Sequence, residues 1–270
     1  MSVSATALTQ TATTEVCADG AYLYGVVYSH EETRLGNIGI AGNEVYTIPY
    51  ENLAAVIHRC PAKPYNAEDK PTVETLVMTH QQVIDAAWER FGDILPSGFN
   101  VIIKDDGGWA PEDIVRRWLK KDFSALQQKL AKVKGKAEYG IQIGWEPHVI
   151  AQEIARNDEE IRRLEEEIKL KPRGAGYFFK GKLEKAIQGR METLADRHFK
   201  DFFQRIKPLV TGLLVEKTKN IASDKQMLLN FSCLVEKDKY RELGAELETI
   251  DNMSGFWVRY TGPWPPYSFA

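Results

Sequence analysis

The sequence is short of cysteine, of long apolar runs and of net positive charge. Its three cysteines, Cys17, Cys60 and Cys233, are odd in number and widely spaced, which fits neither a disulfide framework nor a zinc site. No apolar run reaches the roughly 20 residues that cross a bilayer. The 35 basic and 38 acidic residues leave a formal net charge of −3, which argues against a general nucleic-acid binder. We therefore expect a cytoplasmic protein whose partners are neither membranes nor nucleic acids.

The N-terminal segment has neither the basic start nor the apolar stretch of a secretory signal peptide. It is rich in Ser, Thr and Ala, and the first basic residue is Arg34. We expect residues 1–19 to form a disordered tail outside the fold.

Patterns that indicate catalysis or metal binding are also scarce. None of the histidines has a second His or Cys at metal-ligand spacing: His30, His58, His80, His148 and His198. His80 and His198 fall on the apolar stripes of expected helices, where a histidine is more often a hydrogen-bonded core residue than a catalyst. The Asp105–Asp106 pair precedes two glycines and lacks the further ligands of a calcium loop, which favours a turn. We expect no catalytic residue, no cofactor and no metal.

The patterning of apolar residues in the first half predicts strands and helices in the order β-β-β-α-β-α-β. The expected strands are 22–28, 45–48, 53–58, 94–103 and 139–145. The expected helices run from Pro71 to Gly92 and from Pro111 to Gly135, each between a proline that suits a first turn and a glycine that stops a helix. Helices on one face of a mostly antiparallel sheet give an α+β domain, and a modified ferredoxin-like fold over residues 20–147 fits this order best.

Charged residues become dense after Pro147, and acid-then-base pairs recur four residues apart, as in Glu165–Lys169, an arrangement that stabilises a helix. The apolar residues of this segment form a narrow heptad seam: Ile150, Ile154, Ile161, Leu164 and Ile168. So thin a seam needs one partner helix rather than a wide core. We expect the long helical pattern at 177–206 to supply that partner, after a turn at 172–176, in an antiparallel coiled-coil hairpin.

The remaining residues predict a second, smaller α+β unit. Strands are expected at 209–215, 227–235 and 256–260, with a helix at 239–250. Together with the hairpin, this unit forms an expected C-terminal domain at residues 148–270.

The last residues combine three prolines with three large aromatics, although chain ends are usually polar. The prolines exclude a helix or a central strand here. One interpretation is that the aromatics staple the chain end onto the core. The other is a docking surface for a partner, because Trp and Tyr are enriched in interface hot spots. The residues assigned to that surface are Trp264, Pro265, Pro266, Tyr267 and Phe269.

Several short motifs, in the same order along the chain, carry a resemblance to a known family. They are Tyr22-Leu23-Tyr24-Gly25-Val26-Val27, Leu53-Ala54-Ala55-Val56, His80-Gln81-Gln82-Val83-Ile84, Ile94-Leu95-Pro96, Glu138-Tyr139-Gly140, Gly174-Ala175-Gly176-Tyr177, Met227-Leu228-Leu229-Asn230-Phe231 and Gly262-Pro263-Trp264-Pro265-Pro266-Tyr267-Ser268-Phe269. With these motifs the sequence resembles the GvpL/GvpF family of gas vesicle proteins. The resemblance implies a ferredoxin-like N-terminal domain and a C-terminal α+β domain that carries a coiled coil.

The resemblance also implies a non-enzymatic role in the assembly of gas vesicles, the hollow protein shells that give aquatic microbes buoyancy. Their wall is built from a small, very hydrophobic shell protein, and exposed apolar surface of that kind aggregates. We therefore expect an accessory or minor structural protein that binds the shell protein and prevents its aggregation during nucleation and assembly. Other gas vesicle assembly proteins are expected partners, and the gas vesicle in the cytoplasm is the expected location.

Two other functions remain open from the residues. Ferredoxin-like domains often bind ligands, so a small-molecule-binding or enzymatic protein would use His58, His80 or the Asp105–Asp106 loop in a pocket. A coiled-coil scaffold would instead dimerise through Ile154, Ile161 and Ile168.

Overall fold

The fold consists of two compact units, of which the first ends at Gln128 and the second begins at Lys129. The structure, a computed structural model, describes residues 19–104, 107–170, 176–219, 221 and 224–270. The division lies before the boundary expected at residue 147, because the strand predicted at 139–145 belongs to the second sheet. The tail expected at 1–19, the turn expected at 172–176 and the Asp105–Asp106 pair fall wholly or largely outside the described residues.

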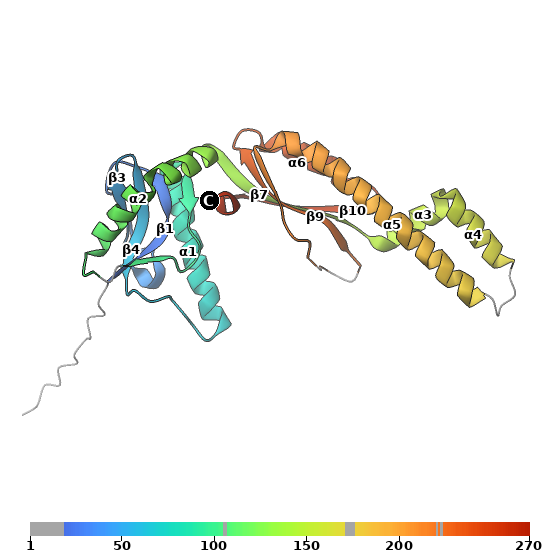
Figure 1. Cartoon of the computed structure of the whole chain (residues 1–270), viewed down its shortest axis with the longest axis horizontal. Coiled ribbons are helices and arrows are strands. Elements are labelled where there is room, and N and C mark those ends of the chain that lie inside the picture. Colours follow the sequence, from blue (N-terminus) through green and yellow to red (C-terminus); the bar gives the residue numbers. More distant parts are fainter. Residues whose placement is uncertain (1–18, 105–106, 171–175, 220, 222–223) are drawn as a thin grey trace, which may run out of the picture. The chain divides into compact units, whose positions relative to one another are not determined.

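Strand β1 (Gly20–Tyr28) is the central strand of the first sheet (Figure 1). It pairs antiparallel with β4 (Leu53–Cys60) on one side and with β5 (Ile94–Pro96) and β6 (Ile102–Lys104) on the other. Beyond β4 the sheet continues through β3 (Val45–Tyr50) to β2 (Arg34–Gly36). Nearly every residue of β1 is buried, as the sequence predicts for a strand whose two faces are both apolar.

Helix α1 (Lys70–Phe91) packs against β1 and β5, and both of its ends follow local rules. The Asp69 carboxylate accepts a hydrogen bond from the Thr72 backbone N–H at 2.9 Å, and Gly92 ends the helix with a φ of 82°. The buried face of the helix is His80, Val83, Ile84 and Ala87. In the first turns, by contrast, three apolar side chains are exposed: Val73, Val77 and Met78.

Helix α2 (Pro111–Val133) is tied to the first sheet through Glu112 in its first turn. The Glu112 carboxylate accepts hydrogen bonds from Arg59 of β4 at 2.5 and 2.6 Å and from the Tyr46 hydroxyl of β3 at 2.6 Å. The bonds from Arg59 lower the pKa of Glu112 to about 2. A charge-assisted pair of this geometry fixes where the helix begins on the sheet.

The second sheet has the strand order β10-β7-β9-β8, and its pairings are antiparallel. The strands are β7 (Lys136–Trp145), β8 (Gly212–Val215), β9 (Gln226–Glu236) and β10 (Phe256–Trp264). The strand predicted at 139–145 was expected in the first domain, and this expectation is wrong. Its alternating pattern predicted the strand itself, but alternation only decides which residues face a core, not which sheet the strand joins.

Helices α5 (Gly176–Ile206) and α6 (Tyr240–Asp251) cover one face of this sheet (Figure 1). On that face Phe231 of β9 packs edge-on against Phe199 and Phe203 of α5. Helices α3 (Pro147–Asn157) and α4 (Glu159–Lys169) pack against α5. Short 3-10 turns occur at Ile40–Gly42, Lys207–Leu209 and Tyr267–Phe269.

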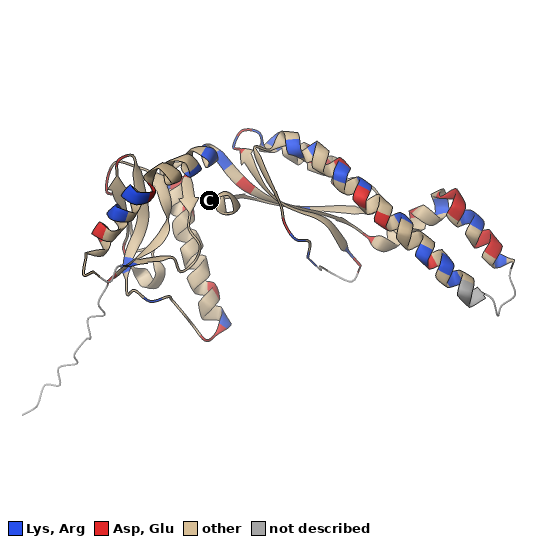
Figure 2. Ribbon diagram, viewed as in Figure 1, with Lys and Arg blue, Asp and Glu red and all other residues tan. Residues whose placement is uncertain are grey.

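The described chain is thus a mixed helix-and-sheet protein with antiparallel sheets, which agrees with the α+β class. Residues of both charges lie along α4 and α5 (Figure 2). Within the part of the chain that the structure describes, no helix combines the length and the hydropathy that crossing a membrane requires.

Candidate partner-binding surfaces

The C-terminal segment folds back onto the sheet face opposite to α5 and α6. We call this the open face, and on β7 it carries Glu138, Gly140, Gln142 and Gly144, which alternate with the buried residues on the helix-covered side. Ser268 donates its backbone N–H to Glu138 Oε2 at 2.7 Å and its hydroxyl to Oε1 at 2.6 Å. Phe269 is 7% exposed and packs at Gly212, where an added Cβ would lie 2.9 Å from the phenyl ring. This geometry matches the interpretation in which the aromatic residues hold the chain end against the core.

The residues assigned to a docking surface are not equally accessible. Pro265 and Pro266 are buried along with Phe269, and Tyr267 is half-buried. Trp264, in contrast, is 46% exposed at the end of β10, which is an outer strand of the described sheet. A docking role of the intact segment therefore rests mainly on Trp264.

The predicted seam residues lie on two helices, α3 and α4, rather than on one. Asp158 separates the helices and caps α4, where it accepts hydrogen bonds from the backbone N–H groups of Glu160 and Ile161 at 3.0 and 3.1 Å. The Asp158 carboxylate also pairs with Arg190 of α5 at 3.0 Å. Asp158 thus serves as a helix cap and a cross-helix partner, which connects the start of α4 to α5.

The apolar seam itself is covered by the chain's own helix α5. Ile150, Ile154 and Ile161 are buried in one cluster with Trp145 and Met191. Leu164 and Ile168, further along α4, are half-buried. The α5 side chains packed against the cluster include Leu183, Ile187 and Leu194. Dimerisation through the seam would therefore require α5 to be displaced.

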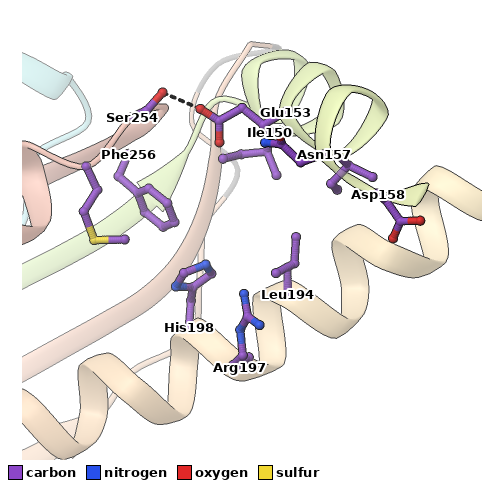
Figure 3. Close-up of a pocket in the computed structure, with 11 residues that line it drawn as sticks. Ile150, Glu153, Asn157, Asp158, Leu194, Arg197, His198, Ser254 and Phe256 are labelled. Carbon is purple, nitrogen blue, oxygen red and sulfur yellow. Dashed lines mark hydrogen bonds between the residues drawn. The ribbon is translucent and has the colours of Figure 1, made fainter. Parts of the chain in front are cut away.

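A cleft of about 460 Å³ opens between α3, α5 and the start of β10 (Figure 3). It is lined by apolar and charged side chains: Ile150, Glu153, Ile154, Asn157, Asp158, Leu194, Arg197, His198, Met253, Ser254 and Phe256. The His198 ring packs edge-on against Phe256 with ring centroids 4.9 Å apart, and burial together with the nearby Arg197 lowers the pKa of His198. Ser254 donates to Glu153 at 2.5 Å. Ser254 is thus paired with the Glu153 carboxylate rather than with His198, so these two residues do not form the serine–histidine contact of a hydrolase.

Two tyrosine–histidine pairs lie in the core of the first unit. The Tyr24 hydroxyl oxygen lies 2.8 Å from His58 Nδ1, and the Tyr22 hydroxyl oxygen lies 3.0 Å from His80 Nδ1. Each tyrosine oxygen also accepts a backbone N–H, from Ile40 in the first pair and from Asn100 in the second. A buried hydroxyl that already accepts a bond is best satisfied by donating its proton, so each tyrosine donates to Nδ1 and each histidine carries its proton on Nε2.

The second nitrogen of each ring is satisfied as well. His58 Nε2 lies 2.9 Å from the Tyr65 hydroxyl, and His80 Nε2 lies 3.3 Å from the Ser97 carbonyl oxygen. Burial lowers the pKa of His58 to about 4 and also lowers the pKa of His80. Both histidines are therefore neutral core residues at pH 7. For His80, a hydrogen-bonded core role was also the one that the sequence pattern favoured.

Thiol and metal chemistry have little support in the described residues. Cys60 and Cys233 are buried, and burial raises the pKa of their thiols to about 11 and about 12. Among the residues that the structure places, no group of three or more His, Cys, Asp or Glu side chains is arranged to hold a metal ion.

Two exposed surfaces were not predicted from the sequence. One is the exposed start of α1, where an amphipathic pattern continues beyond the turns that cover the sheet. The other is the part of the open face with Trp257 and Arg259, which line a second cleft together with Lys225. Trp257 and Arg259 are two residues apart in β10. This spacing could have predicted that they share a face, because every second residue of a strand points to the same side.

Comparison with known proteins gives matches along almost the whole chain. The family model described as gas vesicle synthesis protein GvpL/GvpF matches residues 20–270. Gas vesicle protein L1 of Halobacterium salinarum is 33% identical over 265 residues, which cover 94% of this chain and 91% of that protein. Gas vesicle protein F of Haloferax mediterranei is 24% identical, with 94% of each chain covered. The crystal structure of gas vesicle protein GvpF from Anabaena sp. PCC7120 has the same fold, with a TM-score of 0.72 and 20% identity over 93% of this chain and 98% of that one.

Proposed function

This chain belongs to the GvpL/GvpF family of gas vesicle synthesis proteins, and from this we propose that it binds the hydrophobic shell protein and prevents its aggregation during gas vesicle nucleation and assembly. Membership of the family makes the chain a gas vesicle accessory protein. A shell subunit exposes apolar surface until it is assembled, and such surface aggregates. A protein that covers part of this surface keeps the subunit soluble until it joins the growing wall.

The observation that carries this proposal is the exposure of Trp264 at the end of β10. Tryptophan is over-represented among the residues that dominate binding energy at interfaces. The hydrogen bonds from Ser268 to Glu138 hold the segment that follows Trp264, so the indole is presented from a fixed backbone. A segment with a fixed backbone loses less conformational entropy on binding than a mobile segment. Trp264 is therefore a suitable anchor for an apolar partner.

A second apolar surface supports the proposal in the first unit, on the first turns of α1. Val73 and Val77 are one helical turn apart and lie on the same face, beside the exposed Met78. The charged residues of these turns, Lys70 and Glu74, pair with each other at 3.4 Å. The surface is therefore apolar and locally neutral, which suits the exposed apolar surface of the shell protein.

Matched tryptophan variants test the proposal. Trp264→Ala in the full chain should weaken capture of the shell protein roughly tenfold, the effect expected of a hot-spot tryptophan. Trp109→Ala is the control, because Trp109 is 49% exposed but lies in the first unit, where its ring contacts Arg117. Equal capture by the wild type and Trp264→Ala would remove Trp264 from the interface. No capture by the wild-type chain would contradict shell binding altogether.

We also propose that the protein is not an enzyme. Support comes from His58 and His80, which are buried and use all four of their ring nitrogens in hydrogen bonds. A small-molecule-binding or enzymatic protein, the alternative function, would need these rings to face a cavity. The pairing of Ser254 with Glu153 in the cleft of Figure 3 points in the same direction.

Finer features of the fold and of the cellular role stay predictions. The antiparallel sheet with α1 and α2 supports a ferredoxin-like first unit, and the packing of the Ile154 and Ile161 seam on α5 supports a coiled-coil hairpin. A cytoplasmic location at the gas vesicle is likewise proposed. The proposed partners are the shell protein and other gas vesicle assembly proteins, without nucleic acid or membrane.

A further inference from the structure

The open face of the second sheet is only partly covered. The C-terminal segment occupies the end that carries Glu138. Towards the other end, Gln142 pairs with Arg259 of β10, and Gly144 pairs with Trp257. A cleft of about 460 Å³ lies there, and the described residues that precede β9 form its other side.

Trp257 is the aromatic wall of this cleft. Gly144 allows the indole to lie directly on β7, because an added Cβ would come within 2.3 Å of Trp257 Cζ2. The indole Nε1–H is shielded from solvent and has no hydrogen-bond acceptor in the described part of the chain. A buried donor without an acceptor costs free energy, so hydrogen bonding within the described residues does not explain the position of this indole.

Three cations line the cleft, Lys219, Lys225 and Arg259, and the described residues that line it include no carboxylate. None of the three takes part in an ion pair with any residue that the structure describes. Lys225 Nζ lies 5.9 Å from the centroid of the Trp257 ring. Because the whole chain has a net charge of −3, this cluster is a local feature rather than a general property of the surface.

We propose that this cleft binds an extended acidic segment of a partner protein. Its carboxylates pair with Arg259 and Lys225, and a guanidinium group can hold one carboxylate through two parallel hydrogen bonds. An apolar side chain between the carboxylates packs on Trp257. The inference does not depend on shell-protein binding, because neither Trp264 nor the start of α1 belongs to the cleft.

Charge complementarity favours a protein segment over a nucleic acid. Nucleic-acid binding draws most of its affinity from many phosphate contacts, which a cluster of three cations on a chain of charge −3 does not provide. A short acidic segment needs only two or three such contacts and gains the rest of its affinity from apolar packing on the indole.

The test uses the full chain and a fluorescein-labelled, end-blocked peptide of alternating glutamate and leucine, with binding followed by fluorescence anisotropy. A peptide with glutamine in place of glutamate is the matched ligand control. The double variant Lys225→Glu/Arg259→Glu should bind the glutamate peptide at least roughly tenfold more weakly than the wild type. Lys182→Glu/Lys185→Glu, which makes the same change of charge at exposed positions on α5, should keep the wild-type affinity to within about twofold.

A gain of binding separates loss of the site from loss of the fold. The Lys225→Glu/Arg259→Glu variant should bind a lysine–leucine peptide that the wild type does not bind, which a misfolded chain would not do. The proposal is overturned if the glutamate and glutamine peptides bind the wild type equally, or if both double variants bind the glutamate peptide as the wild type does. It is also overturned if single-stranded DNA or phosphatidylserine vesicles bind the wild type more tightly than the glutamate peptide.

Discussion

Ser268 and Glu138 are joined by two hydrogen bonds, one from the serine backbone N–H at 2.7 Å and one from its hydroxyl at 2.6 Å. Glu138 is 8% exposed, and a buried carboxylate is costly unless its oxygens accept hydrogen bonds. This pair therefore makes the end of the chain part of the second unit. It also explains how a proline-rich terminus can hold Trp264 in one place at the surface.

Phe269 and Trp264 should differ sharply in what they contribute to stability. Phe269→Ala removes a buried ring and should lower the free energy of unfolding by about 3–5 kcal/mol. Trp264→Ala removes an exposed ring and should change it by less than about 0.5 kcal/mol. Urea unfolding of both variants, followed by circular dichroism, measures these changes. A loss of stability for Trp264→Ala as large as that for Phe269→Ala would mean that Trp264 also staples the chain end and is not free to dock.

His58 should make the fold sensitive to mild acid. Burial holds its pKa at about 4 in the folded protein, against an ordinary value of 6.5, so the unfolded chain takes up a proton first as the pH falls. The stability that the neutral ring contributes is complete above pH 6.5 and is lost as the pH falls towards 4. We expect the free energy of unfolding to drop by about 2 kcal/mol between pH 7 and pH 5 from this group.

The measurement that isolates His58 is urea unfolding at pH 7 and pH 5 for the wild type and His58→Gln. Glutamine keeps a polar side chain but does not titrate, so the variant should lose the share of the pH dependence that comes from His58, while His80 and His198, whose pKa values are also lowered, keep theirs. His148→Gln, at an exposed position, is the control. An unchanged pH dependence in His58→Gln would show that the acid sensitivity comes from other groups.

Gly144 and Gly189 should respond to alanine in opposite directions. An added Cβ at Gly144 would lie 2.2 Å from the Gln226 carbonyl oxygen and 2.3 Å from the Trp257 ring, so Gly144→Ala should destabilise the protein by about 1–3 kcal/mol. At Gly189, inside α5, an added Cβ meets no atom within 4 Å. Gly189→Ala should stabilise the helix by about 0.5–1 kcal/mol. Thermal unfolding of the two variants measures both changes. Stabilisation by Gly144→Ala would contradict the position of the Trp257 ring against β7.

Local features of the fold were predictable because their causes lie close together in the sequence. Helix α1 was expected from Pro71 to Gly92 and is found at Lys70–Phe91, since a first-turn proline and a terminal glycine act within one turn of the helix. The place of β7 was not predictable, because pairing with β9 and β10 depends on residues far along the chain. The break at Asp158 had a signal that was missed: an aspartate followed by two glutamates is typical of a helix start.

The candidate site likewise had features that the sequence indicated and features that it did not. The aromatic C-terminal segment stood out in the sequence, but its composition did not distinguish the buried Phe269 from the exposed Trp264. That difference depends on Gly212, which leaves space for the phenyl ring on a strand far from it in sequence. The cleft at Trp257 was hidden for a similar reason, because its three cations come from β10 and from the chain before β9.

We propose above all that this chain keeps the gas vesicle shell protein from aggregating. The most direct test is to express the shell protein alone, with the wild-type chain and with Trp264→Ala, and to measure the soluble fraction of shell protein after centrifugation. We expect a clear rise in soluble shell protein with the wild type, a smaller rise with Trp264→Ala, and the wild-type rise with the control Trp109→Ala. A soluble fraction that is the same with and without the wild-type chain would contradict the claim.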